Sequence, residues 1–164
     1  MKTAVIYYSM SLNTFYVASK IAKELNADLI CLEPEEAYPD SGVKKYFWGG
    51  RSALMKDKPA LKPYSFEADK YDVIILGTPV WASCYTPPLR TFIEKYGKQL
   101  KKKRLGAFAC YSGIGASKAL DKLKNDLGIK DFGATLTIVD PRDKKSTEKD
   151  NRILDFCHRI QSLS

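Results

Sequence analysis

The fold of this chain is organised around the stretch Tyr8-Ser9-Met10-Ser11-Leu12-Asn13-Thr14. This stretch follows a short apolar run over 3–8, rich in β-branched and aromatic residues, and precedes a segment with the apolar spacing of a helix. It is therefore predicted to be the turn between a first strand and a first helix. The first N–H groups of a helix have no partner within it, and the helix dipole adds partial positive charge at that end.

Two interpretations of this turn are open. In one, the hydroxyls of Ser9, Ser11 and Thr14 join the free N–H groups in a cradle for a phosphate. In the other, Ser9 and Ser11 only satisfy the turn and Asn13 caps the helix. The turn lacks the Gly-Lys-Ser/Thr sequence that holds a nucleoside triphosphate and its metal. The stretch alone does not decide between the two.

Size and composition point to a globular protein. The chain has 164 residues, 45% of them hydrophobic and 28% charged, with a formal net charge of +8. This length fits one domain, 1–164, with a sizeable core. No apolar run suffices to cross a bilayer and no secretory signal is recognised, so a cytoplasmic location without membrane contact is expected. Four cysteines, 31, 84, 110 and 157, lack metal-binding spacing and are interpreted as reduced thiols, with no metal site.

Strands and helices are predicted to alternate along the chain. The apolar patterns predict strands over 3–8, 28–32, 71–77, 105–111 and 132–139, and helices over 14–25, 87–97, 116–127 and 147–160. Strict alternation favours an α/β fold of three layers, a doubly wound five-stranded parallel sheet in the order 2-1-3-4-5. The link over 33–72 is too long for a simple loop, so it is expected to be partly structured, with a helix within 43–55 and its aromatic residues 46–48 packed on the sheet.

In that strand order, the turns leaving strands 1, 3 and 4 converge at the carboxyl edge of the sheet. They are 9–14, 78–85 and 112–115. The second turn offers the indole of Trp81, and Gly113 and Gly115 let the backbone of the third approach a ligand closely. Such a set suits a flat ring carried on a phosphorylated tail. Tyr111 is open between ring contact and packing, and Cys84, with no base visible beside it, is interpreted as unreactive.

Several motifs then resemble a known family. Ser9-x-Ser11-x-Asn13-Thr14 resembles the phosphate loop of flavodoxins, and Gly77-Thr78-Pro79-Val80-Trp81-Ala82 followed by Pro87-Pro88-Leu89-Arg90-Thr91-Phe92 resembles the flavin-ring loop of flavodoxin-like FMN proteins. The segment from Gly49-Gly50-Arg51 to Pro63 and the turn Ser112-Gly113-Ile114-Gly115 are similar to the same group. The resemblance covers nearly the whole chain.

The resemblance implies non-covalent FMN. Carried over residue by residue, the cofactor-binding positions are Ser9, Met10, Ser11, Leu12, Asn13 and Thr14 at the phosphate, and Thr78, Pro79, Val80, Trp81, Ala82, Ser112, Gly113 and Gly115 around the ring. Leu12 stands where the family usually has glycine. If that position requires a positive φ, leucine is strained there; otherwise the loop takes another shape.

The implied function is that of an oxidoreductase passing electrons through FMN to a quinone or another acceptor, with NAD(P)H or a redox partner protein as further partners. The alternatives are a simple flavodoxin-type electron carrier and a non-enzymatic ligand- or nucleic-acid-binding protein on the same fold. Shuttling flavodoxins are usually acidic, whereas this chain carries +8, which favours anionic substrates. No helix concentrates the basic charge, which speaks against a nucleic-acid binder. The catalytic residues and the oligomeric state are left open.

Overall fold

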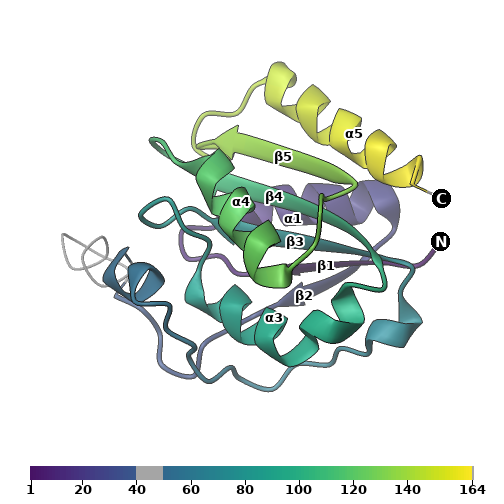
Figure 1. Ribbon diagram of the computed structural model, residues 1–164. Coiled ribbons are helices and arrows are strands. Elements are labelled where there is room, and N and C mark those ends of the chain that lie inside the picture. Colours follow the sequence, from purple (N-terminus) through teal and green to yellow (C-terminus); the bar gives the residue numbers. More distant parts are fainter. Residues whose placement is uncertain (40–49, 164) are drawn as a thin grey trace.

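The computed structural model describes residues 1–39 and 50–163 and contains a parallel five-stranded sheet in the order β2-β1-β3-β4-β5 (Figure 1). The predicted α/β fold and strand order are confirmed. All neighbouring strands pair in parallel, so the carboxyl ends of all five strands meet at one edge. The strands are β1 (Thr3–Tyr7), β2 (Asp28–Cys31), β3 (Val73–Pro79), β4 (Arg104–Tyr111) and β5 (Ala134–Val139).

Helices cover both faces of this sheet, giving the three predicted layers. Helices α1 and α5 lie on one face, and α3 and α4 lie on the other (Figure 1). Their bounds are α1 (Asn13–Leu25), α3 (Pro87–Leu100), α4 (Ala116–Leu127) and α5 (Thr147–Gln161), with a short 3-10 turn, η1 (Ala68–Lys70), before β3.

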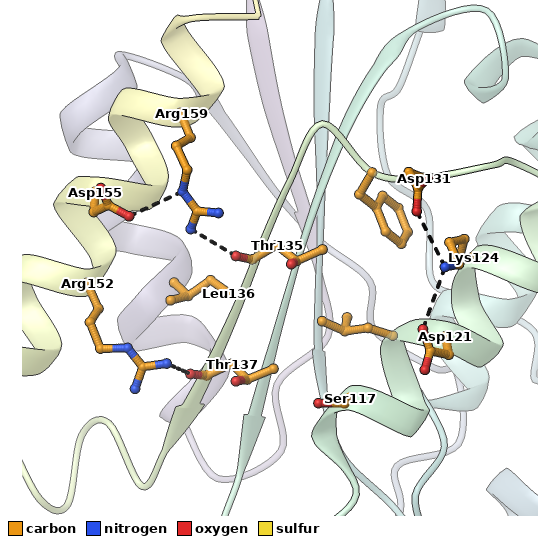
Figure 2. Close-up of a pocket in the computed structure, with 12 residues that line it drawn as sticks. Ser117, Asp121, Lys124, Asp131, Thr135, Leu136, Thr137, Arg152, Asp155 and Arg159 are labelled. Atoms are coloured by element: carbon orange, nitrogen blue, oxygen red, sulfur yellow. Dashed lines mark hydrogen bonds and ion pairs between the residues drawn. The ribbon is translucent and has the colours of Figure 1, made fainter.

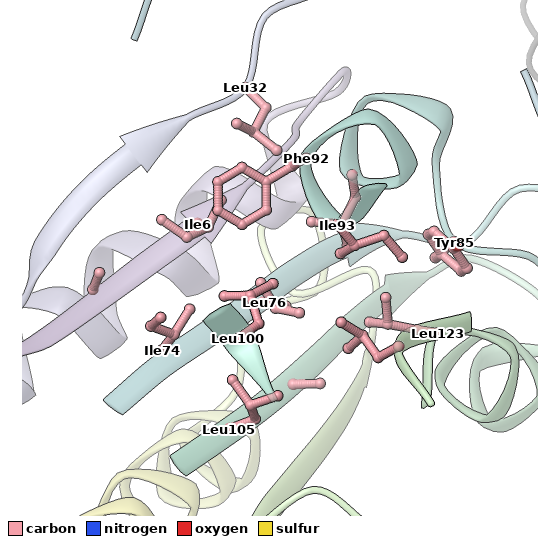
Figure 3. Packing of buried hydrophobic residues seen from close by; sticks show 14 of the residues in the cluster. Ile6, Leu32, Ile74, Leu76, Tyr85, Phe92, Ile93, Leu100, Leu105 and Leu123 are labelled. Atoms are coloured by element: carbon pink, nitrogen blue, oxygen red, sulfur yellow. The ribbon is translucent and has the colours of Figure 1, made fainter. Parts of the chain in front are cut away.

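The two faces of the sheet form two separate cores, because successive side chains of a strand point to opposite faces. In β3, Ile74 and Leu76 pack with Phe92 of α3 (Figure 3), whereas Ile75 packs with Phe156 of α5. These five residues are fully buried. A strand apolar on both faces can occupy only an interior position, so the run over 73–76 fixes β3 in the centre of the sheet.

Several predicted boundaries are wrong. Helix α3 does not stop at Gly97 but continues to Leu100, whose side chain is fully buried in the core under α3 and α4. Strand β3 extends past Gly77 to Pro79, which pairs in register with Cys110 of β4. Strand β5 begins at Ala134 rather than at 132. In each case, tertiary packing or pairing outweighs the local signal of a glycine or an apolar run.

The link between β2 and β3 is only partly described. Residues 50–54 are helical, and an isolated antiparallel bridge joins Pro34 to Leu61. The remainder of the helix predicted within 43–55, and the aromatic residues 46–48, lie outside the described residues. Among the helices that the structure describes, none is both long enough and apolar enough to cross a membrane.

Candidate functional site

The loop from β1 to α1 has, at Leu12, the left-handed backbone that glycine usually adopts. Leu12, immediately before α1, has φ 65° and ψ −1°, in the left-handed region, and its side chain is 51% exposed. The first of the two alternatives for this position is therefore the observed one: the loop keeps its shape and leucine adopts the strained backbone. Left-handed backbone costs a non-glycine residue about 1–2 kcal/mol, a strain found mostly at functional sites.

Two hydroxyls of this loop have different environments. Ser9 Oγ accepts a hydrogen bond from the backbone N–H of Phe15 at 3.1 Å, so it satisfies one of the free N–H groups of α1. Thr14 is buried, and its Oγ1 has no nitrogen or oxygen partner among the described residues, although the Cys110 thiol interacts with it. Buried polar atoms are rarely left unpaired. A buried hydroxyl in the first turn of a helix, beside free N–H groups, is suited to an anionic oxygen.

Asn13 ties this loop to the loop that follows β5. Its Oδ1 accepts from the backbone N–H of Arg142 at 2.9 Å, and its Nδ2 donates to Asp143 Oδ2 at 3.1 Å. Arg142 also donates from Nη1 to the carbonyl oxygen of Ser11 at 3.4 Å. The Asn13 side chain is thus engaged in fixing the loop. Sequence reasoning gave no role to the 140–143 loop, because nothing local to it signals a partner 130 positions away.

The second loop turns back through a two-residue hairpin. Trp81 and Cys84 exchange backbone hydrogen bonds at 3.0 and 2.9 Å, and the central residues, Ala82 and Ser83, have φ 49° and 57°. Positive φ at both central positions is the pattern of a type I′ turn, which Asn and Gly favour and Ala and Ser do not. Thr78 lies behind this turn, fully buried, where its Oγ1 accepts from the backbone N–H of Thr86 at 3.0 Å and fastens the two ends of the loop.

The third loop fits against the second at a single glycine. Gly115, immediately before α4, has φ 95°, and a Cβ on it would lie 2.3 Å from Ser83 Oγ. Glycine is required here for both backbone conformation and space. At Gly113, by contrast, a Cβ would meet nothing within 4 Å. The close contact at Gly115 therefore sets how near the two loops approach, whereas Gly113 faces open space.

These loops surround one cavity of about 250 Å³ at the carboxyl edge of the sheet. It gathers Ser11 and Asn13 from the first loop with Pro79, Val80, Trp81, Ala82, Ser112 and Gly113 from the other two, all of them predicted site residues. The other predicted residues, Ser9, Met10, Leu12, Thr14, Thr78 and Gly115, do not line it. Gly50, Cys110, Tyr111 and Ile114 line it as well, so Tyr111, left open by the sequence, lies at the cavity.

An aromatic cluster borders this cavity. The ring of Trp81 meets Tyr8 edge to face, with centroids 5.7 Å apart, and Tyr38 in the same way at 5.0 Å. Burial raises the pKa of both tyrosines above the ordinary value, so both stay neutral at physiological pH. The sequence analysis missed Tyr38, which lies in the long link; only the fold brings it against Trp81.

Cys84 has a polar neighbour that the sequence did not indicate. The sequence showed no base beside it, but Lys122 of α4 donates from Nζ to Cys84 Sγ at 2.9 Å. The thiol is buried. The contact joins the second loop to α4 and cannot be read from the sequence, since the two residues are 38 positions apart.

A second cavity, of about 440 Å³, lies over the edge strand β5 between α4 and α5 (Figure 2). Here Arg159 and Arg152 donate to the carbonyl oxygens of Thr135 and Thr137 at 3.0 and 2.7 Å. These guanidinium groups satisfy carbonyls that a free strand edge would expose. The arrangement protects an edge strand and lies away from the converging loops.

A doubly wound parallel sheet with a phosphate-type helix start and an aromatic wall at the switch point defines the class of flavodoxin-like nucleotide-binding folds. The comparison with protein families makes this specific: the family model of flavodoxin matches residues 2–135. The chain belongs to the flavodoxin family. The recognition made from the sequence motifs is confirmed, and with it FMN as the cofactor that this family holds.

Solved structures support the same fold. A flavoprotein from Lactobacillus acidophilus NCFM, solved in complex with FMN, matches with TM-score 0.70 and 20% identity over 92% of this chain and 97% of that one. A putative flavoprotein from Bacteroides uniformis ATCC 8492 matches with TM-score 0.74 and 24% identity over 94% and 97%. A flavodoxin from the domain Archaea matches with TM-score 0.57 and 16% identity over 98% and 99%. A comparison with functionally curated proteins gives no match.

Proposed function

We propose that this chain holds FMN non-covalently at the converging loops and passes electrons through it as an oxidoreductase, with a quinone or another small acceptor. The observation that carries the proposal is the meeting of the free start of α1 and the indole of Trp81 on one cavity. The free N–H groups at the start of α1 suit a phosphate, and the indole of Trp81 suits a flat ring. The L. acidophilus relative was solved with this same cofactor.

The residues present fit the group. The N–H groups at the start of α1, with Ser11 at the cavity wall, suit the 5′-phosphate, and Thr14 lies buried behind them in the first turn. Trp81 and Tyr111 are the aromatic residues at the wall, and the open side of Gly113 leaves room for the ring. When bound, FMN supplies the electron-accepting isoalloxazine; the protein binds, orients and shields it.

Partial exposure of the cofactor also supports exchange with a partner. The cavity, at about 250 Å³, is smaller than the ~300–1,000 Å³ of sites that enclose a drug-sized ligand. A bound flavin would therefore keep one part at the surface, where a donor or acceptor can approach. The net charge of +8 favours anionic donors such as NAD(P)H over basic protein partners.

Titration of the purified protein with FMN, followed by flavin fluorescence, tests the binding. The double variant Ser11→Ala/Thr14→Ala removes two hydroxyls from the phosphate side. Hydrogen bonds to a charged group contribute roughly 1.5–3 kcal/mol each, so the affinity is expected to fall about 10²–10⁴-fold. Ser65→Ala, an exposed serine in the link, is the matched control and should bind like the wild type. Equal affinity in all three proteins would reject the phosphate assignment.

A second experiment separates an enzyme from an electron carrier. FMN-loaded protein is mixed with NADPH and a benzoquinone, and NADPH oxidation is followed by absorbance. Steady turnover that depends on protein concentration supports an oxidoreductase. If the loaded protein exchanges electrons only with a chemical reductant and a protein acceptor, it is a carrier.

A further inference from the structure

Arg90 is a buried arginine whose side chain is not fully hydrogen-bonded. It lies in the first turn of α3 and is only 6% exposed. Its side-chain nitrogens Nε and Nη1 are buried and have no hydrogen-bond partner in the structure. Within residues 1–39 and 50–163, no salt bridge joins Arg90 to a carboxylate. An uncompensated buried charge costs several kcal/mol, so its presence requires a physical explanation.

One face of the guanidinium is covered. Arg90 stacks on the ring of Tyr85, with its Cζ 4.6 Å from the centroid. Tyr85 is fully buried, and its hydroxyl donates to Asp126 Oδ2 at 2.5 Å. Burial, together with this hydrogen bond, raises the pKa of Tyr85, so the phenol stays neutral and keeps its proton toward Asp126. Stacking stabilises the cation through its face, and Arg90 also interacts with Tyr85 through a side-chain hydrogen bond, which leaves Nε and Nη1 as the nitrogens without a partner.

Arg90 lines a cavity of about 290 Å³. Tyr85, Ile93 and Asp126 line it with Arg90, and Lys56 and Lys58 add positive charge. Lys58 is paired with Glu94, and the Asp126 carboxylate is engaged by the Tyr85 hydroxyl. The neutral Tyr85 hydroxyl does not cancel the charge of Asp126, so the lining sets Arg90, Lys56 and Lys58 against Glu94 and Asp126, a net formal charge of +1.

The two arginines over β5 differ from Arg90 because their guanidinium groups have carbonyl acceptors. Arg152 and Arg159 each donate to a strand carbonyl, so their side chains have a structural role that satisfies them (Figure 2). Arg90 has the deeper burial, and its Nε and Nη1 have no acceptor. A structural role through stacking alone would be met equally by an apolar side chain, without the cost of burying a charge.

We propose that Arg90 is the anchor of an oxyanion subsite that receives the carboxylate or phosphate group of a small-molecule ligand in this cavity. The N–H groups at Nε and Nη1 have no acceptor, and a charge-assisted hydrogen bond from either one to an oxygen of such a group would supply it. The subsite is separate from the cavity assigned to FMN: the two share no lining residue. Its binding does not require FMN to be bound.

The location relates the subsite to the flavin cavity. Tyr85 comes directly after the hairpin that carries Trp81, so one loop lines both cavities. Tyr38 packs on Trp81, and the charge of Arg90 counteracts the rise that burial causes in the pKa of Tyr38. An anionic ligand held by Arg90 would therefore lie on the side of the Trp81 loop that the flavin cavity does not use.

Calorimetric titration with inorganic phosphate and, separately, with acetate tests the proposal at ionic strength held constant with sodium chloride. The protein is the Ser11→Ala/Thr14→Ala variant without FMN, so that phosphate cannot bind at the start of α1. Saturable binding is expected, with at least a tenfold loss of affinity in Arg90→Met. Lys98→Met, on an exposed position of the same helix, removes the same charge and should bind normally. The stronger of the two anions identifies the ligand group.

Arg90→Lys keeps the charge but loses the fork, and it is expected to bind several-fold more weakly than arginine. It also provides a variant with little risk of unfolding if Arg90→Met does not fold. Thermal unfolding of each protein with and without anion gives the second readout: only proteins with Arg90 should be stabilised. Absence of saturable binding to the parent variant, or equal binding by Arg90→Met, would overturn the proposal. Because the parent lacks the phosphate-loop hydroxyls, either result leaves the FMN assignment untouched.

Discussion

Asn13, the first residue of α1, accepts a hydrogen bond at 2.9 Å from the backbone N–H of Arg142, which lies 129 positions further along the chain. With the bond from Asn13 Nδ2 to Asp143, this contact fastens the loop after β1 to the loop after β5. The candidate phosphate loop is thus held from outside its own sequence, by a segment beyond the residues that the family model matches.

Replacing Asn13 should loosen this connection. Asn13→Ala removes two hydrogen bonds of about 0.5–1.5 kcal/mol each, so the free energy of unfolding is expected to fall by about 1–2 kcal/mol. FMN affinity should also fall, because the loop loses its support. Urea unfolding and flavin titration measure the two effects. Asn151→Ala, at an exposed position of α5, should change neither, and an unaffected Asn13→Ala protein would show that the bridge is not needed.

Leu12 should be a place where glycine stabilises. Left-handed backbone costs leucine about 1–2 kcal/mol, and the extra freedom of glycine in the unfolded chain costs about 0.4–1 kcal/mol. Leu12→Gly is therefore expected to raise the free energy of unfolding by about 0.5–1 kcal/mol, with FMN affinity retained. Leu154→Gly, at an exposed leucine inside α5, should lower it by about 1 kcal/mol. Opposite signs for one substitution would establish the strain; equal losses in denaturant unfolding would dismiss it.

Two glycines of the third loop should differ sharply. Gly115→Ala adds a Cβ 2.3 Å from Ser83 Oγ at φ 95°, and is expected to cost roughly 1–3 kcal/mol of stability and to displace the Trp81 hairpin. Gly113→Ala meets no atom within 4 Å and should be close to neutral. Thermal unfolding and the spectrum of bound flavin measure both. A partial rescue of Gly115→Ala by Ser83→Gly would locate the clash, while two neutral variants would mean that the loops do not touch in solution.

Acid stability should depend on Asp140. Hydrogen bonding from Ser112 and Lys144 lowers the pKa of Asp140 below the ordinary value. A lowered folded-state pKa means that the ionised carboxylate stabilises the fold above the ordinary aspartate pKa of about 4, and that this stability is lost as the pH falls through the folded-state pKa. Asp140→Asn should therefore be less stable than the wild type at pH 7 and show a smaller loss on acidification.

Urea unfolding at several pH values between about 7 and about 2.5 checks this sign. Asp131→Asn, an exposed residue at 3.5 Å from Lys124, is the control and should follow the wild type. If Asp140→Asn and the wild type lose the same amount of stability on acidification, the hydrogen bond between Ser112 and Asp140 does not stabilise the third loop.

The sequence and the structure agree best where a signal is local. The continuous apolar run over 73–76 could only be a buried central strand, and the alternation of strands with helices left little choice of topology. The three turns were placed correctly because the order of the strands places their carboxyl ends at one edge. Ser11, Asn13 and Trp81 meet at the cavity as expected.

Other features could not be predicted from the sequence because they depend on residues that are far apart in it. Thr78 is predicted to contact the cofactor, and the structure adds that it is buried and accepts a hydrogen bond from the backbone N–H of Thr86. Gly97 resembled a helix stop, but the burial of Leu100 carries α3 further. Tyr38 and Lys122 reach the site from segments with no motif of their own.

By itself, then, the sequence determined the fold, the family and the edge of the sheet at which a ligand would bind, because periodicity, turn chemistry and strand order are local properties that add up along the chain. Tertiary structure alone decided that Leu12 takes a left-handed backbone, that Asn13 is tied to the loop after β5, and that Nε and Nη1 of the buried Arg90 have no hydrogen-bond partner. Each of these depends on atoms brought together by folding, and no short stretch of sequence specifies which distant groups will share a buried space.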